Sequence, residues 1–151
     1  MTNNGTAGPP ATITLQAAAP EFFAWNSKYA VLTTPDVTTP PDLNNPPVTQ
    51  PTVQPGATVV LWATGFGPAN PVPSAAQLVP ADQPYPATNA PVVTIGGVQA
   101  QVMSTVLAPG SASLYAVTVV VPDSLSDGDQ PVSVQVAGIQ STGTANVSVK
   151  N

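Results

Sequence analysis

The chain lacks cysteine and histidine, and charged residues are scarce in it. Without these two residue types it has no disulfide, no thiol nucleophile, no imidazole acid–base catalyst and no structural zinc site of the usual kinds. Charged residues make up 6% of the chain, against about 25% in an average soluble protein. Its cations are Lys28 and Lys150, and its net charge is −5. Because phosphate binding needs clustered Lys and Arg, this composition argues against nucleic acids and anionic membrane surfaces as partners.

Long hydrophobic runs are also missing. No stretch approaches the roughly 20 apolar residues of a membrane span, and the polar residues after Met1 do not resemble a signal peptide. The chain has 151 residues, 42% of them hydrophobic, which suits one domain with a hydrophobic core and an appended segment. The remaining composition is rich in Pro, Thr, Ser and Gln, as in secreted bacterial β-modules. We therefore expect an extracellular or cell-surface protein whose native start lies before Met1.

What the chain does contain is a succession of strand patterns. Helix signals are weak, because long charged helix formers are rare and proline recurs throughout. Patterns of alternating or β-branched apolar residues occupy 28–33, 57–65, 91–102, 114–121, 131–138 and 144–150. Gly96 and Gly97 divide the third segment into a hairpin, since glycine tolerates the positive φ angles of a two-residue turn. Alternation with one polar face is typical of an antiparallel sandwich.

Two proline-rich connections interrupt these strands. Residues 34–54 contain six prolines and residues 68–91 contain seven. Loops of this length are uncommon in compact domains, but proline restricts the backbone even in the unfolded chain. We expect both loops to lie on the sandwich, with Leu78, Val79 and Tyr85 contributing to its core. The alternative is a proline-rich ligand for a partner with an aromatic groove.

A resemblance to a known family rests on several ordered motifs. They are PGATVVLWATGFGP (55–68), VTIGGVQAQV (93–102), VPDSLSDGDQPVSVQV (121–136) and NVSVK (146–150). These segments resemble immunoglobulin-like domains of the IPT/TIG type, and above all a largely uncharacterised bacterial C-terminal domain family abundant in acidobacterial secreted proteins. The resemblance implies an all-β fold: an immunoglobulin-like antiparallel β-sandwich with an additional N-terminal strand segment and two long proline-rich loops. That family has no established catalytic residues, so the resemblance implies neither an enzyme nor a cofactor.

The first residues form a unit of their own in this interpretation. Residues 1–19 resemble the closing strand of a preceding domain, and residues 20–151 form the immunoglobulin-like domain. Within the first unit, Ile13 and Leu15 alternate with polar residues, and no turn follows that would pair this strand locally. Because an unpaired strand recruits the edge of another sheet, Ile13 and Leu15 are candidate contacts for a neighbouring copy or an adjacent domain. A head-to-tail contact of this kind that does not close into a ring builds a filament.

Three carboxylates, Asp123, Asp127 and Asp129, lie within seven residues of one another. Calcium prefers oxygen ligands, so they are a weak calcium candidate, although their spacing differs from that of the helical calcium loop. The other interpretation is a polar turn between strands, in which Asp and Gly supply the turn conformation. The remaining carboxylates show no glycosidase-like pairing, and no histidine is present to complete a serine triad. We therefore expect no catalytic residue.

Aromatic residues gather near the start of the domain. Phe22, Phe23, Trp25 and Tyr29 are half of the eight aromatic residues in the chain. If their rings were exposed and coplanar, they would form a platform on which sugars stack. If buried, they would close one end or edge of the sandwich, since aromatic side chains dominate core packing. We favour packing and keep these four residues as candidate interaction residues.

These observations lead to two functional hypotheses. The first is a non-enzymatic structural or adhesive module of a secreted or surface protein. It would pack with neighbouring copies or adjacent domains, with N-terminal strand exchange into an extracellular filament as one mode of assembly. The alternative is a carbohydrate-binding module that uses the cluster at Phe22–Tyr29 and has a polysaccharide as its partner. The first predicts that the chain's own sheet leaves Ile13 and Leu15 uncovered, and the second predicts exposed rings.

Overall fold

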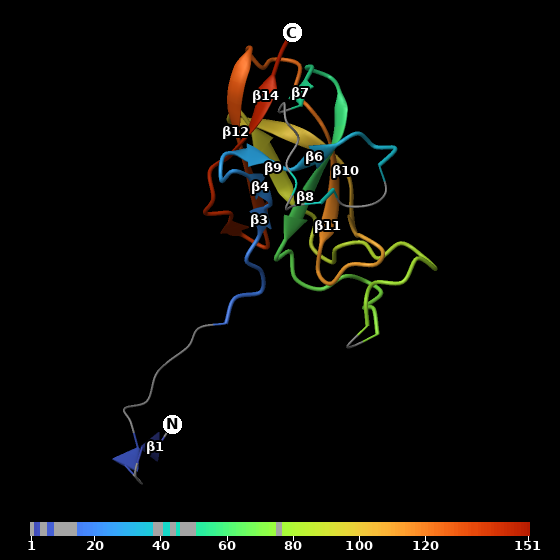
Figure 1. The fold of residues 1–151 in the computed structure, drawn as a ribbon, viewed down its shortest axis with the longest axis vertical. Coiled ribbons are helices and arrows are strands. Elements are labelled where there is room, and N and C mark those ends of the chain that lie inside the picture. The colour runs from blue at the N-terminus through green and yellow to red at the C-terminus, as the bar shows by residue number, and fades with distance from the viewer. Residues whose placement is uncertain are drawn as a thin grey trace.

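A computed structural model describes residues 2–3, 6–7, 15–37, 41–42, 45, 51–74 and 77–151 of the chain. Among these residues there are strands and turns but no helix, and the strands pack as an immunoglobulin-like sandwich (Figure 1). The predicted all-β class is therefore confirmed. In this part of the chain no helix is long and apolar enough to cross a membrane.

The first layer of the sandwich centres on two antiparallel neighbours, β8 and β11, with β10 on the far side of β11. The short strands β3 and β6 both pair with β8 on its other side. The strands of this layer are β3 (Glu21–Phe22), β6 (Leu32–Thr33), β8 (Thr58–Thr64), β10 (Val98–Leu107) and β11 (Tyr115–Val120).

The second layer runs from the start of β10 through β9 and β12 to β14. Both β5 and β7 pair with β14 in parallel, β4 pairs with β5, and β13 pairs with β12. The strands of this layer are β4 (Ala24–Trp25), β5 (Tyr29–Ala30), β7 (Thr52–Val53), β9 (Val92–Ile95), β12 (Gly128–Val136), β13 (Ile139–Gln140) and β14 (Ala145–Val149).

The predicted hairpin joins β9 to β10. Gly96 and Gly97 have φ angles of 59° and 78°, as a two-residue turn of this type requires. The register Val98↔Ile95 closes the hairpin directly around these two glycines. Further along, the pairing of β10 with β11 shifts between Val102 and Ser104, which is a β-bulge. β10 thus leaves one layer and enters the other, and the two layers join along this strand.

Most of the core lies between the layers, where alternate residues of each strand point inward. Fully buried examples are Leu61, Ile95, Val117, Val134 and Val147. A second apolar cluster lies on the outer face of the first layer and consists of Trp25, Val31, Val60, Trp62 and Ala108. β8 is consequently buried on both of its faces, which explains its nearly continuous apolar sequence.

The long loop 68–91 only partly follows its prediction. Val79 and Tyr85 are buried as expected, but Leu78 is 61% exposed, so the expectation that it joins the core is wrong. The backbone N–H of Val79 donates a hydrogen bond to the carbonyl of Ser111, and its carbonyl accepts one from Gly110. These hydrogen bonds keep the neighbouring Leu78 on the outside of the loop. Of the other long loop, 34–54, the structure describes residues 34–37, 41–42, 45 and 51–54.

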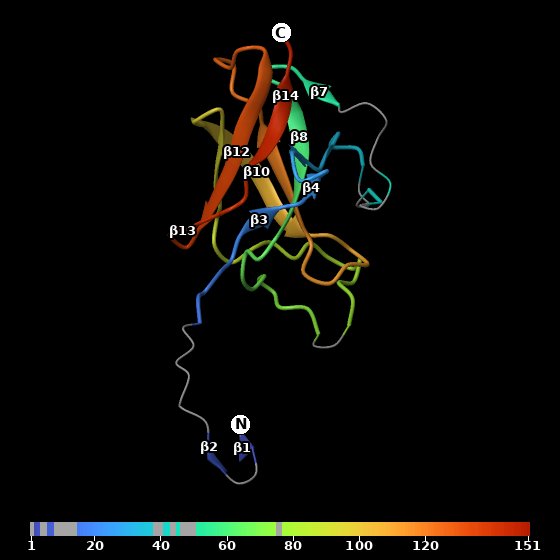
Figure 2. The same cartoon turned by 60° about the vertical axis from the view of Figure 1, so that its left-hand side comes forward.

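The N-terminal segment contains two very short strands, β1 (Thr2–Asn3) and β2 (Thr6–Ala7), which pair only with each other among the described strands. Figures 1 and 2 show them apart from the sandwich. The alternation of Ile13 and Leu15 predicts a strand over residues 11–16. Residues 11–14, which include Ile13, lie outside the described residues. Leu15 and Gln16 are described and do not belong to a strand.

Candidate interaction surface

The N-terminal segment meets the sandwich at the end of β8. The backbone N–H of Ala19 donates to the carbonyl of Gly65 over 2.8 Å. Ala18 and Pro20 are buried, whereas Ala17 and the Ala19 side chain are exposed. This alternation is what an extended chain lying against a sheet edge produces. The segment is therefore fixed to the sandwich from Ala18 onward.

Two glycines make this contact geometrically feasible. Gly65 and Gly67 have φ angles of +77° and +84°, a region that L-residues with side chains rarely adopt. A Cβ atom at Gly65 would collide with the carbonyl of Ala19, and one at Gly67 would lie 2.9 Å from the carbonyl oxygen of Ala17. Nothing in the local sequence signals that another backbone passes so close to these two glycines.

Phe66, between the two glycines, holds this turn against the core. Its side chain is fully buried and stacks on Tyr115, with ring centroids 5.3 Å apart and an interplanar angle of 17°. The Tyr115 hydroxyl donates to the carbonyl of Gly67 over 2.9 Å. Burial raises the pKa of Tyr115, so this hydroxyl stays protonated and available as a donor. The surface against which the N-terminal segment lies is therefore rigidly built.

Leu15 lies just before the fixed part of the segment, and its side chain is 92% exposed. It borders an open hollow of about 560 Å³ that is also lined by Phe66, Ser113 and Tyr115. Of the two residues singled out in the N-terminal pattern, Leu15 is the described one, and the chain's own sheet does not cover it. Its contact with another copy stays a prediction.

Glu21 connects the start of the domain to the opposite layer. Its backbone pairs with Thr64 in the first layer. Its Oε2 accepts hydrogen bonds from the N–H groups of Thr142 (3.2 Å) and Gly143 (2.9 Å), in the turn that precedes β14. These partners are 121 and 122 positions away along the chain. Nothing local in the sequence signals the contact.

The four clustered aromatic residues do not form a common surface. Phe22 is buried in the main core, whereas Trp25 is buried in the outer cluster, with Phe23 packed against it. Tyr29 is half-buried beside β14. The packing interpretation of Phe22 and Trp25 is therefore confirmed, and the stacking platform is not present among these residues. Residues 21–33 instead close one edge of the sandwich.

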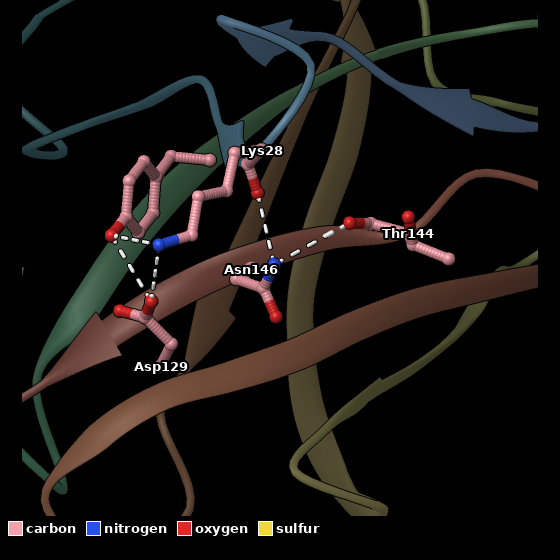
Figure 3. A network of polar contacts seen from close by, with 5 residues as sticks. Lys28, Asp129, Thr144 and Asn146 are labelled. Carbon is pink, nitrogen blue, oxygen red and sulfur yellow. Dashed lines mark hydrogen bonds and ion pairs between the residues drawn. The ribbon is translucent and has the colours of Figure 1, made fainter.

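A polar network ties this closed edge to β12 and β14 (Figure 3). Nζ of Lys28 lies 2.9 Å from Oδ2 of Asp129 and donates to the Tyr29 hydroxyl over 2.8 Å. The same hydroxyl donates to Asp129 over 3.0 Å, and the Asn146 amide donates to the Lys28 carbonyl over 3.1 Å. The hydrogen bonds to Tyr29 and Asp129 raise the pKa of Lys28, and Lys28 in turn lowers the pKa of Asp129.

The three predicted calcium ligands are not brought together. Asp129 is engaged by Lys28, whereas Asp127 accepts hydrogen bonds from the backbone N–H (2.8 Å) and the side chain (2.5 Å) of Asn151. These bonds lower the pKa of Asp127. Asp123 lies instead beside Gly56. Across the described residues, no cluster of three or more carboxylates is arranged to hold a metal ion. The turn interpretation fits the observed contacts.

Comparisons of the chain with protein-family models, with curated proteins and with solved structures found no match. The family resemblance therefore stays a prediction from the motifs quoted above. The contacts of residues 15–21 and the exposure of Leu15 carry the functional argument.

Proposed function

We propose that this chain is a non-enzymatic structural or adhesive module of a secreted or cell-surface protein, and that it assembles with neighbouring copies through its N-terminal strand segment. The exposure of Leu15 carries this proposal. Burying a leucine side chain contributes roughly 1.5–3 kcal/mol, and the described sandwich leaves this contribution unused. A partner surface that buries Leu15 would add this amount to the free energy of association.

The way the segment is attached supports the same proposal. Ala18 to Pro20 are fixed beside Gly65, so the residues before them start from a defined point and direction. A short strand presented in this way loses less conformational entropy on binding than a free peptide does, which favours association. The donor segment and any acceptor edge lie on different parts of the chain, so the contact is heterologous and can propagate from copy to copy.

The carboxylates support a structural role as opposed to a catalytic one. Glu21 binds the turn before β14, Asp127 binds the C-terminal Asn151, and Asp129 binds Lys28. Asp82 accepts a hydrogen bond from the buried Tyr85 over 3.0 Å. The contacts of Glu21, Asp127 and Asp129 connect distant parts of the fold, whereas that of Asp82 holds its own loop together. No observation favours the carbohydrate-binding alternative, because Phe22 and Trp25 are buried.

The test is the oligomeric state of the full chain. We expect size-exclusion chromatography with light scattering to show concentration-dependent assembly, and electron microscopy to show linear particles. Removal of residues 1–17 should leave a monomer. Leu15→Asp should also prevent assembly, because a charge cannot be buried in an apolar contact. Gln16→Asp adds the same charge at the neighbouring exposed position and should leave assembly intact if the two side chains point to opposite faces.

A full chain that stays monomeric at high concentration would contradict the proposal. So would assembly that persists after removal of residues 1–17, since the contact would then lie elsewhere. Equal loss of assembly in Leu15→Asp and Gln16→Asp would show that charge alone is responsible, and would remove Leu15 from the contact.

A further inference from the structure

The outer face of the first layer carries more apolar surface than the described residues cover. Trp62 of β8 belongs to the outer apolar cluster, which Trp25 joins from the edge formed by residues 21–33. Beyond Trp62 the apolar surface continues in register onto β11 and β10, through Ala116 and Val106. Both of these residues are partly exposed. Because the outer face of a sandwich is usually polar, an apolar surface there suggests a binding site.

A groove of about 530 Å³ lies over this part of the face. Its depth follows from the pairing of the strands, since Ala116 lies between Trp62 on one neighbouring strand and Val106 on the other. A methyl group between two larger side chains leaves a depression in the surface. Small-molecule sites in proteins are mostly apolar hollows of about 300–1,000 Å³, and this groove falls in that range.

Two segments from opposite sides of the layer form the walls of the groove. Pro35 and Val37 follow β6, which pairs with β8 on the side away from β11. Residues 81–84 lie beside β10, because the backbone N–H of Leu107 donates to the carbonyl of Tyr85 over 2.9 Å. Backbone pairing thus attaches both walls to the layer, so a ligand loses little affinity in ordering them.

The groove has one charged side chain among its lining residues, the carboxylate of Asp82. Tyr85 is buried, and its hydroxyl donates to Oδ1 of Asp82 over 3.0 Å, which holds the carboxylate at the wall. A carboxylate has two acceptor oxygens, so Oδ2 is able to accept a further hydrogen bond from a ligand. The site therefore presents one positioned negative charge beside an apolar floor.

The charges around the groove all have the same sign. Asp36 lies between two lining residues, and hydrogen bonds from Thr34 and from its own backbone lower its pKa, so it is ionised at neutral pH. No lysine lines the groove in the part of the chain that the structure describes, and Lys28 is engaged by Asp129. Charge complementarity consequently favours a cation as the ligand.

We propose that this groove binds a small organic cation, in which an apolar group carries a protonated amine. The apolar group lies on the floor over Ala116, and the ammonium donates a hydrogen bond to Asp82. An anion is repelled by both carboxylates, and a neutral molecule forms no charged contact with Asp82. The site does not include residues 1–19, so it is independent of the assembly proposed above.

Direct binding to the full chain tests the site with three probes of similar shape: 1-naphthylmethylammonium, 1-naphthylmethanol and 1-naphthoate. We expect the ammonium to bind saturably and to shift the NMR signals of amides in residues 81–84, 106–109 and 116–118. The alcohol should bind about fivefold more weakly, because it lacks the charged hydrogen bond. The naphthoate should not bind. High salt should narrow the difference between the ammonium and the alcohol.

Ala116→Leu tests the floor of the groove. The larger side chain fills the depression between Trp62 and Val106, so the ammonium and the alcohol should both bind about tenfold more weakly or worse. Gln135→Leu is the matched control, since it places a leucine at an exposed position of a strand in the other layer, and it should leave binding unchanged. Circular dichroism of each variant verifies that it is folded.

Asp82→Asn tests the charge and keeps an oxygen acceptor for the Tyr85 hydroxyl. It should weaken the ammonium to the affinity of the alcohol and leave the alcohol unchanged. Asp123→Asn removes the same charge from a residue that does not line the groove, and it should preserve the preference for the ammonium.

Three results would overturn the proposal. If no probe binds, or if Ala116→Leu binds them normally, the groove is not the site. If the ammonium and the alcohol bind equally, or if Asp82→Asn keeps the preference for the ammonium, the ligand is not selected as a cation. If the same amides shift with protein concentration when no probe is present, a second copy occupies the groove, and the small-molecule assignment fails.

Discussion

One edge of the sandwich is closed by residues 21–33, which pair with β8 in the first layer and with β14 in the second. The opposite side of the sandwich is formed by β10, which pairs with β11 in the first layer and with β9 in the second and carries a bulge between Val102 and Ser104. The closed edge also carries charged contacts, from Glu21 and from Lys28 with Asp129. The residues around the bulge in β10 are uncharged and partly apolar. The two layers are thus joined by short strands and charged contacts on one side and by a single long strand on the other.

The largest expected effect on stability comes from Gly65→Ala, which disrupts the contact between Gly65 and Ala19 at the start of the closed edge. The added methyl meets the Ala19 carbonyl at a positive φ angle, so we expect a loss of about 3 kcal/mol or more in the free energy of unfolding. Urea denaturation measures it. Gly97→Ala is the control, because Gly97 also has a positive φ but open space around it, and it should lose only about 1–2 kcal/mol. Equal losses would show that the contact with Ala19 is unimportant.

Glu21→Ala removes the side-chain bridge across the same edge. The N–H groups of Thr142 and Gly143 would lose a charged acceptor, and we expect a destabilisation of about 1.5 kcal/mol. Glu21→Gln keeps an acceptor oxygen at the same place and should lose less. Hydrogen exchange of the Gly143 amide should accelerate in Glu21→Ala. Unchanged exchange would contradict the role of Glu21 in holding this turn.

Next to the bulge of β10, the expected change in stability has the opposite sign. Thr105→Val replaces an unsatisfied buried hydroxyl by a methyl group of similar size, so the free chain should gain about 1 kcal/mol in stability. The measurement is urea denaturation of the full chain. Thr64→Val removes a hydroxyl that does have a partner, the Ser113 carbonyl at 3.1 Å, and should not stabilise. A loss of stability in Thr105→Val would show that the hydroxyl has a partner in solution.

The smallest effect concerns the exposed ion pair of Lys28 and Asp129. Because Lys28 lowers the pKa of Asp129 below its ordinary value of 3.8, this carboxylate stabilises the fold above that pH, and its contribution is lost as the pH falls through the lowered value. The stability difference between the wild type and Asp129→Asn should therefore shrink below about pH 4. High salt at neutral pH should shrink it as well. A difference that is independent of pH would exclude the ion pair as its cause.

Much of the fold could be predicted from sequence because it depends on local patterns. The hairpin at Gly96 and Gly97 and the segments that became β8, β11, β12 and β14 follow directly from alternation and turn residues. Residues 28–33 were read as one strand, but they form β5 and β6 in different layers. A pattern of alternating burial does not specify which layer a strand joins, because that depends on distant partners.

The candidate site could be predicted only in part, for the same reason. Leu15 was found from its apolar pattern, and the structure leaves it exposed. The partners of Glu21 and the backbone that passes Gly65 are far away in sequence and have no local signal. The burial of Thr105 was missed because the bulge near Met103 interrupts the alternation that would have marked it as inward-facing.

The contact between Ala19 and Gly65 also determines how the molecule bears mechanical tension. If copies are joined through their N-terminal segments, a pulling force enters each sandwich at Ala19 and passes along the backbone into β3, whose hydrogen bonds transmit it to β8. β8 is held by β11 on one side and by β3 and β6 on the other, and the segment leaves along the direction in which β8 runs (Figure 2). The force then acts along the strand, so that its hydrogen bonds are loaded in shear and share the tension instead of opening one after another.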